Sequence, residues 1–91
     1  MPRIGRHVRV TGLVQGVFFR AWTAGQARAL GVSGWVRNDP DGSVEAHLAG
    51  DEAAVTRMVE RLRIGPPQAI VDRLDVEEVP PESGDRFEIH H

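Results

Sequence analysis

The spacing of apolar residues along this chain switches repeatedly between the alternation typical of strands and the three- and four-residue spacing typical of helices. The order in which these patterns follow one another limits the fold more than any other feature. Five short segments have the alternation or the extended character of strands: residues 7–13, 33–37, 43–48, 70–77 and 86–90. In two longer segments, 21–30 and 51–62, apolar or small residues recur three and four positions apart. That spacing predicts amphipathic helices.

Turn-forming residues separate these segments. Gly31 follows the first predicted helix, where a left-handed residue commonly ends a helix. Gly-Pro-Pro at 65–67 ends the second helix. Asn-Asp-Pro-Asp-Gly at 38–42 lies between two predicted strands, which indicates a hairpin. In the second strand of this hairpin, Glu45 and His47 share the face opposite the apolar residues, and we expect that face to meet water.

The order of the elements is strand, helix, two strands, helix, strand and a short last strand. This order predicts an α+β fold, a ferredoxin-like split βαβ sandwich in which two helices cover one face of an antiparallel sheet. A chain of 91 residues is long enough for one compact core. We therefore expect residues 1–91 to form a single domain.

The residue types that the chain lacks exclude several chemistries. The sequence contains no Cys and no Lys, so it offers no thiolate nucleophile, no disulfide, no P-loop lysine and no Schiff base. The formal net charge of -2 gives no broad positive field, so we expect no nucleic-acid partner. Residues 1–6 lack the apolar run of a signal peptide, and no run of about 18 apolar residues occurs. These observations predict a cytoplasmic monomer without membrane contact.

A glycine-containing loop lies between the first strand and the first helix, from Gly12 to Arg20. Such a loop can aim several backbone N–H groups at one point, beside the positive end of the helix dipole, and so form an anion cradle. Arg20 adds a planar fork of donors that suits two phosphate oxygens. Spacing alone leaves a second interpretation equally open, in which the glycines only turn the chain and Arg20 is solvated.

Two blocks of sequence resemble a known family. The chain has Val-Thr-Gly-Leu-Val-Gln-Gly-Val-Phe-Phe-Arg at 10–20 and Gly-Val-Ser-Gly-Trp-Val-Arg-Asn at 31–38. These blocks resemble the acylphosphatase signature V-x-G-x-V-Q-G-V-x-F-R followed by G-x-x-G-W-V-x-N, and match every fixed position. The resemblance implies a metal-free, cofactor-free hydrolase that cleaves the carboxyl–phosphate bond of small acyl phosphates.

The resemblance also assigns roles to residues. It implies that residues 15–20, called the phosphate loop below, bind the substrate phosphate through Gln15, Gly16, Val17, Phe18, Phe19 and Arg20. Arg20 would hold the phosphate, and Asn38 would hold the attacking water. Inorganic phosphate or sulfate should then inhibit by occupying the same loop.

The implied chemistry requires few groups. Phosphoryl transfer through a loose transition state needs positioning and charge stabilisation, and a carboxylate with a pKa of about 4 leaves without a proton. Asn38 cannot act as a base, but its amide can orient a water in line with the bond that breaks.

Two residues near Asn38 raise questions of their own. Asp39 stands where the family often has a small or polar residue, and its carboxylate would weaken anion binding if it pointed inward. Ser43 stands where the family often has a hydroxyl residue, which could fix Asn38 by a hydrogen bond. An ordinary serine at the start of a strand is an equally good interpretation.

The remaining candidates carry no predicted chemistry. His7 and His47 lie in predicted strands without a carboxylate at metal-ligand spacing, and His90 and His91 end the chain. The two tryptophans at 22 and 35 are expected to pack.

Two alternative functions suit the same fold class. RNA-binding modules share it, but they need exposed aromatic residues in central strands, whereas aromatic residues make up only 5% of this chain. The other alternative is the acylphosphatase-like domain of larger carbamoyl-transfer enzymes of hydrogenase maturation. The absence of a linker at either end of the sequence favours a free-standing protein.

Overall fold

The computed structural model describes residues 2–91. Its elements are β1 (Arg3–Leu13), α1 (Phe19–Leu30), β2 (Ser33–Asn38), β3 (Val44–Asp51), α2 (Glu52–Ile64), β4 (Ile70–Val79) and β5 (Phe87–His90). The predicted order of strands and helices is confirmed, although β1 begins earlier than the alternation indicated. Neither helix in the described part of the chain is long and apolar enough to cross a membrane.

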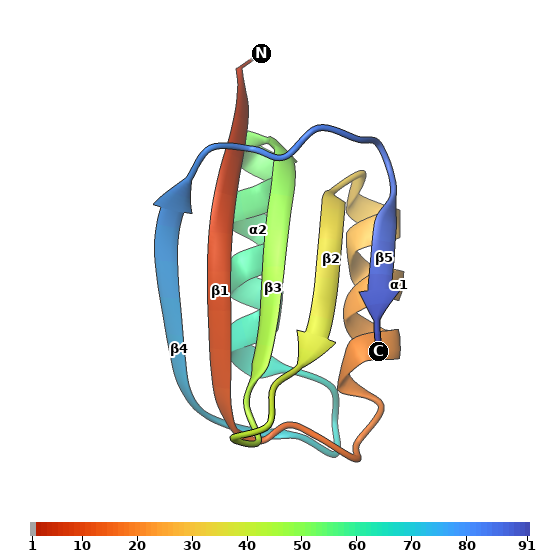
Figure 1. Ribbon diagram of the computed structural model, residues 1–91, viewed down its shortest axis with the longest axis vertical. Helices are drawn as coiled ribbons and strands as arrows, with labels where there is room; N and C mark the ends of the chain where they lie inside the picture. The colour runs from red at the N-terminus through yellow and green to blue at the C-terminus, as the bar shows by residue number, and fades with distance from the viewer. Residues whose placement is uncertain (1) are drawn as a thin grey trace.

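The five strands form one sheet in the order β4-β1-β3-β2-β5, and both helices cover the same face of it (Figure 1). β3 runs antiparallel to both β1 and β2, and β4 runs antiparallel to β1. β5 instead pairs parallel to β2. The predicted α+β, ferredoxin-like sandwich is confirmed, but the expectation of a wholly antiparallel sheet is wrong at this edge. The reason is that the chain crosses the sheet between β4 and β5 instead of turning back in a hairpin.

The core lies between the helices and the sheet. Its largest fully buried side chains are Phe19 of α1, Leu48 of β3, and Met58 and Leu62 of α2. Full burial of side chains of this size stabilises the fold by about 1.5–3 kcal/mol each. The predicted apolar face of β3 therefore packs against the helices.

The opposite face of β3 differs from the expectation that it meets water. Glu45 and His47 on that face are only 8% and 3% exposed. Residues 80–86, called the strap below, cross from β4 to β5 near one end of the sheet (Figure 1). The backbone N–H of Glu82 in the strap donates to Nε2 of His47 over 3.1 Å. The strap thus covers His47, and strand periodicity cannot reveal such a cover because it comes from a distant segment.

The contacts of the strap define the protonation state of His47. Arg3 donates to the carbonyl oxygens of Glu82 and Gly84 over 3.0 and 2.8 Å and so holds the strap in place. Because Nε2 of His47 accepts a hydrogen bond, the ring is neutral and its proton lies on Nδ1, 3.6 Å from the Glu82 carboxylate. Burial lowers the pKa of His47, the Glu82 carboxylate partly opposes this, and nearby His7 and Arg3 lower it further.

The lowered pKa of His47 predicts a pH-dependent stability. Between the folded pKa and the unfolded value of about 6.5 the unfolded chain binds more protons, so the free energy of unfolding should fall as the pH drops through this range. Urea unfolding at pH 7.5 and 5.5 measures the loss. His47→Gln should reduce that loss. Equal pH dependence in the two proteins would contradict the assignment.

Two glycines should respond oppositely to alanine. Gly34 in β2 has φ 132°, and a Cβ there would overlap the carbonyl oxygen of His47. Gly34→Ala should therefore destabilise the protein by about 2–4 kcal/mol. Gly25 lies in α1, where an added Cβ would have no contact within 4 Å beyond the helix's own backbone, so Gly25→Ala should stabilise by about 0.5–1 kcal/mol. Denaturant unfolding measures both changes in the free energy of unfolding. A Gly34→Ala variant as stable as the parent protein would show that β2 and β3 are not so closely paired.

Candidate active site

Two loops meet at the end of the molecule where β1 and β2 finish (Figure 1). Residues 14–18 join β1 to α1, and residues 39–43 close the β2–β3 hairpin. A cleft of about 300 Å³ lies there, lined by Val14, Gly16, Phe18, Phe19, Arg20, Ala21, Asn38, Ile89 and His91. The structure therefore brings Arg20 and Asn38, which were predicted from separate motifs, to one cleft.

The backbone of the phosphate loop has the geometry of an anion cradle. Gly16 has φ 76°, and Phe18, the N-cap residue of α1, has φ 60° and ψ 26°. Left-handed residues in such a turn point successive N–H groups toward a common centre. The Phe18 side chain has no acceptor and forms no capping hydrogen bond, so it leaves the first amides of α1 to other acceptors.

A left-handed phenylalanine is costly, by about 1–2 kcal/mol, and such outliers concentrate at functional sites. The loop is held in this conformation by neighbouring residues that enter the core. Val14 is fully buried and Phe19 is 2% exposed, whereas the ring of Phe18 is 79% exposed. The buried side chains on either side of the turn thus fix a backbone that Phe18 would not adopt by itself.

Arg20 extends from the first turn of α1 toward the end of β5. Its Nη1 donates to the carbonyl oxygen of His90 over 2.9 Å and lies 3.3 Å from Nδ1 of His91. Both contacts use the same nitrogen. Within residues 2–91, Nε and Nη2 of Arg20 make no hydrogen bond, so one edge of the guanidinium keeps two donors for a ligand.

Asn38 is the last residue of β2 and pairs with Val44 of β3. This pairing holds its backbone beside β3 at the last position of the strand. Asn38 lines the cleft, and its side-chain amide forms no hydrogen bond to any other described residue. An amide in this state can hold a water by donating or by accepting.

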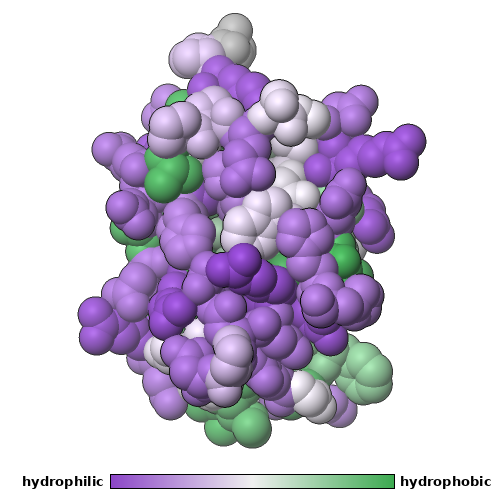
Figure 2. All heavy atoms as spheres, in the orientation of Figure 1, coloured by the Kyte–Doolittle hydropathy of each residue, from purple (hydrophilic) through white to green (hydrophobic). Residues whose placement is uncertain are grey.

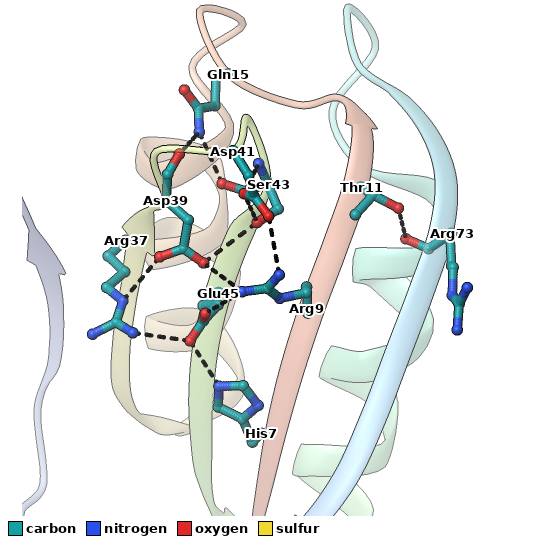
Figure 3. Close-up of polar contacts among 10 residues, drawn as sticks. All are labelled: His7, Arg9, Thr11, Gln15, Arg37, Asp39, Asp41, Ser43, Glu45 and Arg73. Carbon is teal, nitrogen blue, oxygen red and sulfur yellow. Dashed lines mark hydrogen bonds and ion pairs between the residues drawn. The ribbon is translucent and has the colours of Figure 1, made fainter.

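The carboxylate of Asp39 does not line the cleft. It turns to the outer face of the sheet, where Oδ1 accepts from Nε of Arg37 over 3.2 Å and Oδ2 from Nη2 of Arg9 over 3.3 Å (Figure 3). The Asp39 side chain is only 10% exposed. The departure from the family pattern at this position therefore places no carboxylate inside the site.

Asp39 and Glu45 form a carboxyl pair between two arginines (Figure 3). Glu45 accepts from Arg9 over 2.8 Å and from Arg37 over 3.0 Å, and Nε2 of His7 lies 2.9 Å from its Oε2. Hydrogen bonding by the Asp39 side chain, followed by that of Arg9, lowers the pKa of Glu45 to about 2. Burial raises the pKa of Asp39. Since two guanidinium groups offset the pair, it repels an anion in the cleft only weakly.

The hydroxyl of Ser43 contacts Asp41 and, over 3.3 Å, Oδ2 of Asp39. It forms no hydrogen bond with Asn38. Ser43 thus directly precedes β3, and its hydroxyl bonds within the hairpin loop.

The Gln15 side chain makes contacts that the sequence did not reveal. Its Nε2 donates to the carbonyl oxygen of Asp39 over 2.7 Å and to that of Ser43 over 2.8 Å (Figure 3). A ligand can therefore reach Gln15 through its backbone but not through these donors. In the sequence, Gln15 was distinguished as a fixed position of the family motif and as a polar residue among glycine and apolar residues at 14–18, but neither signal shows which groups its side chain contacts.

Histidines and tryptophans lie mainly on the outer face of the sheet. Trp35 stacks on His90 with ring centroids 5.3 Å apart, and on the helix side Trp22 packs edge-on against Phe19 at 5.7 Å. Residues 2–91 contain no group of three His, Cys, Asp or Glu side chains that could hold a metal ion. The surface on this side is mostly hydrophilic, and exposed apolar groups gather at the end where the loops meet (Figure 2).

Sequence comparison assigns this architecture to a family. The family model described as acylphosphatase matches residues 6–89. The chain belongs to the acylphosphatase family. An acylphosphatase of Rhizorhabdus wittichii is 55% identical over 78 residues, which are 86% of this chain and 79% of that protein.

Solved structures agree with this membership. An acylphosphatase from Coxiella burnetii superposes with a TM-score of 0.93 at 38% identity, over 97% of this chain and 93% of that one. HypF of T. kodakarensis superposes with a TM-score of 0.80 at 36% identity, over 94% of this chain but only 11% of that protein. The acylphosphatase fold therefore occurs both in proteins of this length and within much larger ones. Family members are hydrolases that act on acyl phosphates.

Proposed function

We propose that this acylphosphatase hydrolyses the carboxyl–phosphate bond of small acyl phosphates to a carboxylate and inorganic phosphate. The observation that carries the proposal is the convergence of Arg20 and Asn38 on one cleft beside the amides of the phosphate loop. In this reaction Arg20 and those amides hold the phosphate oxygens, and Asn38 orients a water for in-line attack on phosphorus. One P–O bond forms to the water as the bond to the carboxylate oxygen breaks.

The arrangement suits a reaction without a general acid. The carboxylate departs with the electron pair of the broken bond, and a leaving group with a pKa of about 4 needs no proton. The proton lost by the attacking water passes to a phosphate oxygen. Donors that are fixed before the substrate arrives stabilise the charge that develops on the phosphoryl oxygens without reorganising.

We also propose that the described chain acts as one domain, as a cytoplasmic monomer and without a metal or cofactor. Its radius of gyration of 11.8 Å supports one compact unit, because a single domain of this length has about 12 Å. Phosphate or sulfate should compete with the substrate, since either anion can accept from the same loop amides and from Arg20.

Substrate preference tests the proposed reaction. Phosphate release from acetyl phosphate in EDTA should exceed release from an alkyl phosphate monoester by at least ~10²-fold, because the monoester needs the general acid that this site lacks. Arg20→Gln should lower phosphate release from acetyl phosphate toward the uncatalysed rate, which links the activity to the cleft. Equal turnover of both substrates, or activity that EDTA removes and Mg²⁺ restores, would contradict the mechanism.

Substitutions at the two site residues should have different kinetic effects. Arg20→Gln should raise the Ki for inorganic phosphate and lower kcat, because its guanidinium contacts the anion in the ground state and the transition state. Asn38→Ala should lower kcat by roughly 10²-fold or more but leave the phosphate Ki nearly unchanged. Gln68→Ala, at an exposed amide of the α2–β4 loop, serves as the control with normal kinetics.

Thermal unfolding of each variant completes this test. If Asn38 only shapes the turn, Asn38→Ala should lose about 1 kcal/mol of stability and keep normal turnover per folded molecule. That result would remove Asn38 from the site.

A further inference from the structure

We propose that Gln15 is a positioning residue, whose side chain ties the phosphate loop to the β2–β3 hairpin and so fixes Asn38 relative to the bound phosphate. The inference rests on the proposed function of the cleft. In this proposal the Gln15 side chain contacts neither the substrate nor the attacking water. Its role is to align the attacking water with the substrate phosphate.

The contacts of Gln15 span both arms of the hairpin. Its Nε2 donates to the carbonyl oxygen of Asp39, the residue that follows Asn38, and to that of Ser43 on the opposite arm. Figure 3 shows the amide reaching from the phosphate loop to these two carbonyls. An amide nitrogen carries two hydrogens, so both donors are used and none is left for an anion.

The hairpin does not need these bonds in order to close. The N–H of Asp39 donates to the carbonyl oxygen of Ser43 over 2.9 Å, and the N–H of Gly42 donates to that of Asp39 over 3.1 Å. Each carbonyl therefore keeps a backbone partner without Gln15. What Gln15 adds is a connection between two loops that belong to different elements, and this connection runs past the cleft.

Asn38 depends on its neighbours for its position. Its own amide has no hydrogen-bond partner within residues 2–91, whereas Asp39 is held at its carboxylate by Arg9 and Arg37 and at its carbonyl by Gln15. The arginines fix the hairpin against the outer face of the sheet. Among residues 2–91, Gln15 makes the side-chain hydrogen bonds that join the hairpin to the phosphate loop. This side chain therefore sets the separation between the water site and the phosphate site. An error of about 1 Å in such a separation costs about 10²-fold in rate.

Two variants remove the connection. Gln15→Met keeps the length of the side chain but has no donor, and Gln15→Asn keeps the amide but is one methylene too short to reach the hairpin. Both should lower kcat for acetyl phosphate by about 10-fold or more. Both should change the phosphate Ki by less than about threefold, because Arg20 and the loop amides remain.

A matched control separates positioning from stability. Gln26 of α1 accepts from Arg61 of α2 over 2.6 Å, and neither residue lines the cleft. Gln26→Met removes a side-chain hydrogen bond of a similar kind and should lower the thermal midpoint without changing kcat per folded molecule. A loss of kcat in this control equal to that in Gln15→Met would overturn the proposal.

The decisive measurement combines Gln15→Met with Asn38→Ala. If Gln15 acts through Asn38, Gln15→Met should change kcat by less than about twofold in the Asn38→Ala background, since coupled residues are not additive. If Gln15→Met lowers kcat in that background as much as it does in the parent protein, the proposal is overturned. Unchanged kcat in both Gln15 variants would also overturn it, and so would a rise in phosphate Ki as large as that of Arg20→Gln. If Gln15→Met does not fold, Gln15→Asn is read in the same way. An inactive parent protein would instead refute the proposed function itself.

Discussion

The position of the site follows from one constraint, the antiparallel pairing of β3 with both β1 and β2. Two strands that are each antiparallel to a third are parallel to one another, so β1 and β2 finish at the same end of the sheet. The helix that connects them, α1, must begin where β1 ends. The loop that leads into α1 and the last residue of β2, Asn38, therefore lie side by side at one cleft. The insertion of β3 between the two strands also supplies the hairpin to which Gln15 of that loop is hydrogen-bonded.

Charged side chains on the outer face of the sheet lie near the same end of the molecule as the cleft. Three carboxylates, those of Asp39, Asp41 and Glu45, lie on or next to the hairpin that carries Asn38, and uncompensated they would oppose an anion nearby. Arg9 contacts all three, and Arg37 contacts Asp39 and Glu45. The exposed pairs contribute little stability individually. Together these ion pairs hold the hairpin against the outer face of the sheet and offset the negative charge of its three carboxylates.

The sequence predicted the elements because their periodicity records which face is buried, and it predicted Arg20 and Asn38 because a family motif contains them. It did not predict contacts between segments that lie far apart. The parallel pairing of β5 and the burial of His47 both depend on the strap, whose course is not encoded in any local pattern. The direction of Asp39 depends on arginines of β1 and β2, and the bonds of Gln15 depend on carbonyl oxygens, which every residue has. Each missed feature is a long-range polar contact.

The loop that carries the site is less free than its position at the surface suggests. Val14 and Phe19 anchor it in the core, Gln15 anchors it to the hairpin, and the left-handed residues between these points turn the amides outward. The ligand-facing groups, by contrast, contribute little to packing. The loop is therefore stabilised by side chains other than those that face the ligand. Its rigid backbone does not restrict any movement that the proposed site requires. The proposed reaction requires only aligned donors and one oriented water, and a fixed loop suits it because the loop dipoles need not rearrange as charge develops.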